Sequence, residues 1–196
     1  MKSSYLLKNI FTDNVSVTKN VEKTLFDAIL DTAELIYKRL LAGNKIMTCG
    51  NGGSAADSQH FASELINRFE RDREELAALA LTTDSSTLTS IANDYGYDKI
   101  FSKQIAALGK KNDILLAFTT SGNSENICRA IEKAQIIGAT VILLSGKNGG
   151  NAALMLKKED RELRIPSSST ARIQESHLVV IHCICGLIEN KLREEQ

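Results

Sequence analysis

The sequence predicts an α/β protein: a three-layer α/β/α sandwich with a central five-stranded parallel sheet and additional helices at its N-terminus. Five short strand-like runs, four of them almost continuously apolar, alternate with helical patterns along the chain. Parallel strands that are covered on both faces have this composition, and the intervening helices supply the two outer layers. A length of 196 residues, without a low-complexity tract or an internal repeat, favours a single domain.

The strands are expected at residues 45–49, 77–82, 113–119, 139–145 and 161–165, and the helices between and after them at 54–69, 84–93, 98–108, 124–137 and 171–194. Before the first strand, Val21, Leu25, Ile29, Ile36 and Leu40 repeat at helical spacing and predict a helix over 20–42. A shorter helix is expected near 3–12. We expect residues 1–43 to serve oligomerisation and 44–196 to form the α/β core, because the apolar stripe of 20–42 is wide enough to cover a second subunit.

The composition excludes several classes of protein. Lys plus Arg and Asp plus Glu both total 24 and aromatic residues are 5%, so nothing favours nucleic-acid binding. Four cysteines with no framework spacing are expected to be reduced, as in cytoplasmic proteins. The first residues lack the apolar core of a signal peptide, and we expect no run of membrane-spanning length. These features together predict a soluble, cytoplasmic protein.

A glycine-rich turn at residues 50–54 (Gly-Asn-Gly-Gly-Ser) joins the first strand to the next helix. Backbone N–H groups at such a helix start suit a phosphate or sugar hydroxyls, although the same turn can serve only as a tight connection. It is neither a Walker A loop nor a Gly-x-Gly-x-x-Gly fingerprint, which makes a nucleotide a less favoured ligand. One helical turn apart, His60 and Glu64 form either a metal-binding or acid/base pair or an ordinary surface pair.

The expected strands are followed by loops that are rich in Ser, Thr, Gly and Asn. The best of them, residues 119–124 (Thr-Thr-Ser-Gly-Asn-Ser), offers four hydroxyls at the start of a helix. Ligands of open parallel sheets bind where the carboxyl ends of the strands gather. The loops therefore predict a site for a phosphorylated or hydroxyl-rich ligand.

The two loops 50–54 and 120–124 together resemble the sugar isomerase (SIS) domain, whose Ser- and Thr-rich loops hold phosphosugars. Within this family, residues 60–64 (His-Phe-Ala-Ser-Glu), 92–94 (Ala-Asn-Asp) and 172–177 (Arg-Ile-Gln-Glu-Ser-His) followed by His182 resemble the phosphoheptose isomerases. The resemblance covers nearly the whole chain. It implies a zinc-dependent aldose–ketose isomerase that converts sedoheptulose 7-phosphate into D-glycero-D-manno-heptose 7-phosphate. This reaction begins the nucleotide-heptose synthesis that feeds lipopolysaccharide core, capsule or S-layer glycans.

The resemblance also assigns roles to residues and implies a homotetramer with active sites at subunit interfaces. The implied substrate contacts are Asn51, Gly52, Gly53, Glu64, Asn93, Asp94, Thr119, Thr120, Ser121, Ser124 and Gln174. The implied ligands of one Zn²⁺ per subunit are His60, Glu64, Gln174 and His182. Glu64 matches the general base and His182 the general acid, and these roles overlap with metal binding.

Spacing leaves the metal ligands open. Gln174 and His182 lie about 12 Å apart along one continuous helix, so they share a metal only if Gln174 sits at the helix entrance or different subunits supply them. Spacing alone favours Gln174 with His177, and the choice of His182 rests on the resemblance. Either histidine has a core or interface position as its ordinary alternative.

A regulator is the main alternative to an enzyme. The chain is also similar to SIS-fold tetramers that bind the replication initiator DnaA, and this resemblance lies in residues 54–56, 59–62, 66–70 and 171–175. That group typically lacks a carboxylate at Glu64 and a histidine at His182, and both are present here. A phosphosugar sensor without turnover is a third reading. Ala171 stands where some isomerases carry an aspartate, and Arg68 is either a phosphate contact across an interface or a solvated side chain.

Overall fold

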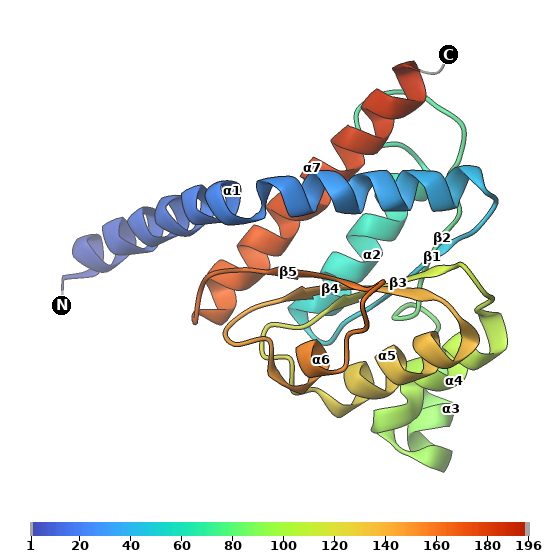
Figure 1. The fold of residues 1–196 in the computed structure, drawn as a ribbon. Helices are drawn as coiled ribbons and strands as arrows, with labels where there is room; N and C mark the ends of the chain where they lie inside the picture. The colour runs from blue at the N-terminus through green and yellow to red at the C-terminus, as the bar shows by residue number, and fades with distance from the viewer. Residues whose placement is uncertain (1, 195–196) are drawn as a thin grey trace.

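The computed structural model describes residues 2–194 and has a five-stranded parallel sheet between two layers of helices (Figure 1). The strand order is β2-β1-β3-β4-β5, and every neighbouring pair is parallel, which confirms the predicted α/β class. The strands are β1 (Ile46–Cys49), β2 (Ala78–Ala80), β3 (Ile114–Phe118), β4 (Thr140–Ser145) and β5 (Arg161–Arg164). The helices are α1 (Ser3–Leu41), α2 (Gly53–Ile66), α3 (Ser85–Tyr95), the 3-10 helix η1 (Tyr97–Lys99), α4 (Ile100–Leu108), α5 (Glu125–Ile137), α6 (Gly150–Leu154) and α7 (Thr170–Glu194).

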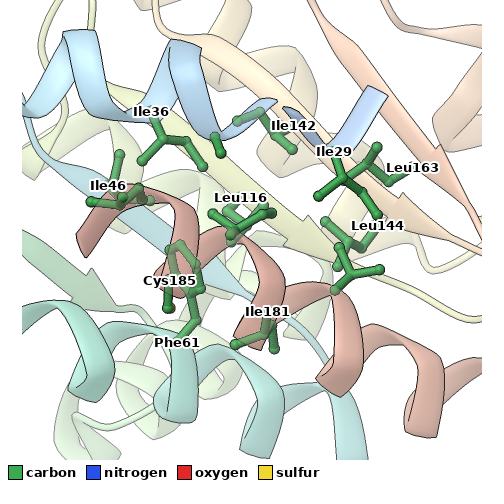
Figure 2. Close-up of a cluster of buried hydrophobic side chains, with 14 of the residues drawn as sticks. Ile29, Ile36, Ile46, Phe61, Leu116, Ile142, Leu144, Leu163, Ile181 and Cys185 are labelled. Atoms are coloured by element: carbon green, nitrogen blue, oxygen red, sulfur yellow. The ribbon is translucent and has the colours of Figure 1, made fainter. Parts of the chain in front are cut away.

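The alternation of side chains along β3 divides the core into two parts. Ile114, Leu116 and Phe118 point to the face that α1, α2 and α7 cover, where Figure 2 shows Leu116 among side chains of these helices. Leu115 and Ala117 point to the opposite face, beneath α3, α4 and α5. All five side chains are fully buried, as expected for a central strand with two covered faces.

The N-terminal segment forms one continuous helix of 39 residues, so the expectation of two separate helices was wrong. Contacts with α7 stabilise the N-terminal third of α1, where polar and β-branched residues lower the helix propensity. Arg172 donates to the backbone carbonyl of Ile10 at 3.0 Å, and Asn14 donates to Glu175 at 2.8 Å. The N-terminal end of α1 projects beyond the sheet (Figure 1).

Helix α7 packs against both α1 and α2 and contributes the buried residues Ile173, Val180, Ile181 and Ile184. Its length and mean hydropathy of 1.2 would be enough to cross a membrane, so the expectation that no run reaches that length was wrong. In this fold 44% of that apolar stretch is buried. Packing in the core therefore accounts for its apolar character.

Candidate active site

Helices α2 and α7 bring His60, Glu64 and His182 together. The Nε2 atom of His60 lies 2.9 Å from Oε1 of Glu64 and 3.4 Å from Nε2 of His182. The two imidazole rings meet edge to face, with centroids 5.1 Å apart and an interplanar angle of 67°. The Glu64 side chain is 19% exposed, so this carboxylate borders solvent but is largely enclosed. The predicted helical pair thus has a second histidine as its neighbour.

Gln174 lies at the other end of the same pair of helices. A Cβ atom on Gly53 would overlap the Gln174 side-chain amide, which places this amide against the first turn of α2. Gly53 precedes His60 by seven residues, or about 10 Å along a helix. Within one chain, three of the four predicted zinc ligands are therefore close together, and Gln174 is apart from them.

The donors at this cluster fit zinc in their chemistry. Two imidazole nitrogens and a carboxylate form a common zinc-binding set, and Zn–N bonds of about 2.0–2.1 Å place two tetrahedral ligands about 3.3 Å apart. The 3.4 Å between the histidine nitrogens is close to this separation. Within residues 2–194 no group of three or more His, Cys, Asp or Glu side chains is already arranged around a metal position. The three side chains are thus donors of the types that zinc binds.

The other histidine of α7 that spacing offered as a metal ligand, His177, has a different role. His177 is fully buried beneath the sheet, and its Nε2 atom lies 3.1 Å from the carbonyl oxygen of Ser145. A carbonyl only accepts, so Nε2 carries the hydrogen and donates. Burial lowers the pKa of His177 to about 4. His177 is a neutral core residue, and His182 is the histidine of α7 that meets His60.

A second group of predicted residues forms a polar cradle at the carboxyl ends of β1 and β3. Asn51 and Asn126 exchange two amide hydrogen bonds, each of 2.8 Å, and so connect the starts of α2 and α5. The Tyr97 hydroxyl donates to the same Asn51 oxygen at 3.1 Å. Asn126 and Tyr97 were missed by sequence reasoning. The only signal for Asn126 was its position in the first turn of a helix that follows a hydroxyl-rich loop.

Hydrogen bonds within the loop at residues 119–124 fix its backbone, and the loop also offers hydroxyl groups to a ligand. The buried Thr119 hydroxyl accepts from the backbone N–H of Gly122 at 3.1 Å. The Ser121 hydroxyl accepts from the N–H of Asn123 at 3.3 Å. Ser124 immediately precedes α5, and its side chain makes no capping hydrogen bond to the helix. Its hydroxyl is therefore available to a ligand, as are the first N–H groups of α5.

The remaining predicted contacts border this cradle. Gly52 has a positive φ of 57° at the start of α2, a conformation that favours glycine. Thr120 lies partly exposed in the hydroxyl-rich loop. Asn93 and Asp94 are exposed near the end of α3, where the Asn93 amide donates to the Asp94 carboxylate at 2.8 Å. Tyr97 follows Asp94 after two intervening residues, and its hydroxyl group reaches the Asn51 side chain of the cradle.

The chain is similar to known proteins of one family. A family model described as SIS domain matches residues 11–146. The phosphoheptose isomerase of Shewanella sediminis is 53% identical over 186 residues, which cover 95% of this chain and 94% of the relative. A phosphoheptose isomerase structure from Francisella tularensis has a TM-score of 0.95 and 42% identity, covering 97% of this chain and 100% of that one. The Neisseria gonorrhoeae structure has a TM-score of 0.91 and 44% identity, covering 95% and 98%.

The parallel sheet with its hydroxyl-rich loops and the family match define a SIS-domain protein. At this identity over nearly its full length, the chain belongs to the phosphoheptose isomerase family of sugar-phosphate isomerases.

Proposed function

We propose that this protein converts sedoheptulose 7-phosphate into D-glycero-D-manno-heptose 7-phosphate. The observation that carries the proposal is the joining of Glu64, His60 and His182 in one cluster, in a family of phosphoheptose isomerases. A non-catalytic regulator that binds DnaA has no need for this arrangement of a carboxylate and two imidazoles. The cluster therefore favours the enzyme over the regulator.

The reaction moves hydrogen between two neighbouring carbons. Glu64 removes a proton from C1 of the ketose, which gives an enediolate, and the proton is returned at C2 to give the aldose. His182 donates to and accepts from the oxygens as the carbonyl moves from C2 to C1. The Glu64 carboxylate is largely enclosed but still borders solvent, so it can make both transfers and exchange its proton with water between them.

The phosphate group is proposed to bind the hydroxyl-rich loop. Thr119, Thr120, Ser121 and Ser124 provide hydroxyls there, and α5 provides unpaired N–H groups. Asn51, Gly52 and Gly53 would contact the sugar from the neighbouring turn, as would Asn93 and Asp94. Binding the phosphate far from the reacting carbons supplies energy that fixes C1 beside the base.

We propose one zinc ion per subunit, held by His60, Glu64 and His182. A bound zinc ion would act as a Lewis acid on the substrate oxygens. Gln174 lies about 10 Å along α2 from this cluster, so it would complete the ligand set only if a neighbouring subunit supplied it. Glu64 would then bind the metal and move the proton in turn.

A homotetramer with shared active sites is proposed from the surface of α1 and α7. An apolar groove of about 550 Å³ runs between these helices, lined by residues that include Val21, Phe26, Ile29 and Cys183, and His182 also lines it. Phe26 is 59% exposed, and further apolar side chains are exposed towards the N-terminus of α1. A second subunit that covered this groove would lie directly beside the catalytic cluster. We further propose a cytoplasmic location, where the product would enter nucleotide-heptose synthesis.

The proposal is tested by incubating the pure protein with sedoheptulose 7-phosphate in deuterated buffer and following the aldose by NMR, with and without zinc. Wild type should form aldose with deuterium at C2, while Glu64→Gln and His182→Ala should not. The exposed Glu75→Gln variant, on the loop after α2, is the matched control and should remain active. A wild type that forms no aldose in any metal state would contradict the proposed function.

A further inference from the structure

We propose that Phe69, held in place by Glu189 and Arg73, is a positioning residue that orients the His182 imidazole. The inference rests on the proposed function, because it assigns His182 a part in proton transfer. It concerns the loop at residues 67–77, which follows α2 and contains no predicted catalytic group.

The ring of Phe69 lies against the His182 ring. Their centroids are 5.4 Å apart, with an interplanar angle of 32°. Phe69 also lies over Gly186, one helical turn further along α7, where a Cβ atom would be 3.7 Å from the Phe69 ring. His182 thus has Phe69 beside one part of its ring, while its Nε2 atom faces His60. Together these neighbours restrict rotation of the imidazole.

The backbone of Phe69 is fixed by a carboxylate from α7. Glu189 accepts from the N–H of Phe69 at 2.9 Å through one oxygen, and from the N–H of Glu70 at 3.2 Å through the other. Its side chain is only 9% exposed, and charge-assisted hydrogen bonds of this kind are stronger than neutral ones. Glu189 follows His182 by seven residues, so both lie on one face of α7. The helix that carries His182 therefore also fixes the aromatic ring beside it.

Arg73 ties the same loop to the end of α2. Its guanidinium donates to the carbonyl oxygens of Leu65 at 2.8 Å and of Glu64 at 2.5 Å. The Arg73 side chain is 6% exposed, and its Nε atom lies 3.6 Å from the Glu189 carboxylate. The buried pair of Arg73 and Glu189 thus connects the backbone of the proposed base with the ring that borders the proposed acid.

Burying an ion pair costs more desolvation than exposing one, unless hydrogen bonds compensate the charges. Here two backbone N–H groups and three backbone carbonyls surround the pair, and all belong to α2 or the loop after it. The pair therefore fixes backbone positions instead of binding a ligand. By linking the backbone at the end of α2 to Glu189 of α7, the pair holds these two helices at a fixed distance beside the catalytic cluster.

The test uses Phe69→Leu, Phe69→Tyr and Glu189→Gln in the full-length protein, with the exposed Arg71→Ala as the control on the same loop. The first measurement is the ¹⁵N NMR signal of His182 Nε2 without substrate, because this signal follows the contact of the nitrogen with His60, and loss of an aromatic ring current shifts a nitrogen far less than a changed hydrogen bond does. The second is kcat and KM for sedoheptulose 7-phosphate. Thermal melting shows whether each variant is folded.

In Phe69→Leu the His182 signal should move and kcat should fall by roughly 10- to 100-fold with KM within about twofold, as expected for a misplaced catalytic group. Phe69→Tyr should restore both, Glu189→Gln should change both in the direction of Phe69→Leu, and Arg71→Ala should change neither. An unchanged His182 signal in folded Phe69→Leu would overturn the inference, as would a raised KM with unchanged kcat. If wild type lacks isomerase activity, the proposed function fails, while the NMR signal still decides whether Phe69 orients His182.

Discussion

His60 and His182 face each other through their Nε2 atoms at 3.4 Å, although 122 residues separate them in the chain. When no metal ion lies between the two nitrogens, one donates a hydrogen bond and the other accepts it. The two Nε2 atoms therefore cannot both carry a hydrogen. The contact joins α2 to α7 at the level of Glu64. Any change in the distance between these helices would therefore alter the candidate base and the candidate acid together.

Glu64→Gln should abolish most of the isomerase activity. The amide keeps the size of the side chain but cannot accept the C1 proton, so kcat should fall by about 10²- to 10⁴-fold. KM should change little, because the phosphate contacts lie on the other loop. Steady-state kinetics checks this result against Glu75→Gln. Retention of more than about a tenth of wild-type kcat would show that another group is the base.

Asn126→Ala should weaken substrate binding more than it slows the reaction. Asn51 would lose both of its hydrogen bonds with the Asn126 amide, and a net loss of about 1 kcal/mol corresponds to a roughly fivefold increase in KM. Asn126→Asp should raise KM further, because a carboxylate would repel the substrate phosphate. The measurement is KM with kcat recorded in parallel. Asn190→Ala, an exposed change on α7, is the control and should leave KM unchanged.

The buried His177 should make the protein less stable in mild acid. Burial lowers its pKa to about 4 from an ordinary value of 6.5, so the unfolded chain binds more protons between these pH values. The free energy of unfolding should therefore decrease as the pH falls through this window, by roughly 3 kcal/mol in total. Urea titrations at several pH values measure the slope. His177→Gln should reduce it, and an equal slope in this variant would assign the acid sensitivity to other groups.

Asp57 should have the opposite effect on how the stability of the protein changes with pH. Burial raises the pKa of its carboxyl to about 6, against the lowering effect of His60. The folded state then binds more protons than the unfolded state between about 3.8 and 6, so stability contributed by this group decreases as the pH rises. Asp57→Asn should raise Tm at pH 8 by a few degrees, since this half-buried group is partly screened by solvent. The gain should vanish below pH 4, and a pH-independent gain would contradict the assignment.

Phe26→Glu should dissociate the proposed assembly. A charge in the apolar groove between α1 and α7 would have to be buried by the second subunit, at a cost of at least about 2 kcal/mol per contact. Sedimentation equilibrium should then show smaller species than for wild type. Lys23→Glu introduces the same charge at an exposed polar position of α1 and should leave the assembly intact. A wild-type monomer would contradict the proposed tetramer.

The sequence predicted the features that depend on local patterns. Apolar runs predicted four of the five strands, the short run at 161–165 predicted the fifth, and the hydroxyl-rich loop was recognised because its residues are contiguous. The approach of His182 to His60 could not be derived, because it depends on how α7 packs against α2. The continuity of α1 was missed for a similar reason: Arg172 and Glu175, far away in the chain, stabilise its N-terminal third. Asn126 was missed because only its partner Asn51 gives it a role.

The paired amides of Asn51 and Asn126 have a consequence for how the enzyme would respond to acidity. Neither side chain ionises, so the spacing between the starts of α2 and α5 is independent of proton concentration. The cradle for the phosphate would keep its shape across the physiological range. Acidity would then act on the chemical step and on the charge of the substrate phosphate, and not on the geometry of the groups that bind it.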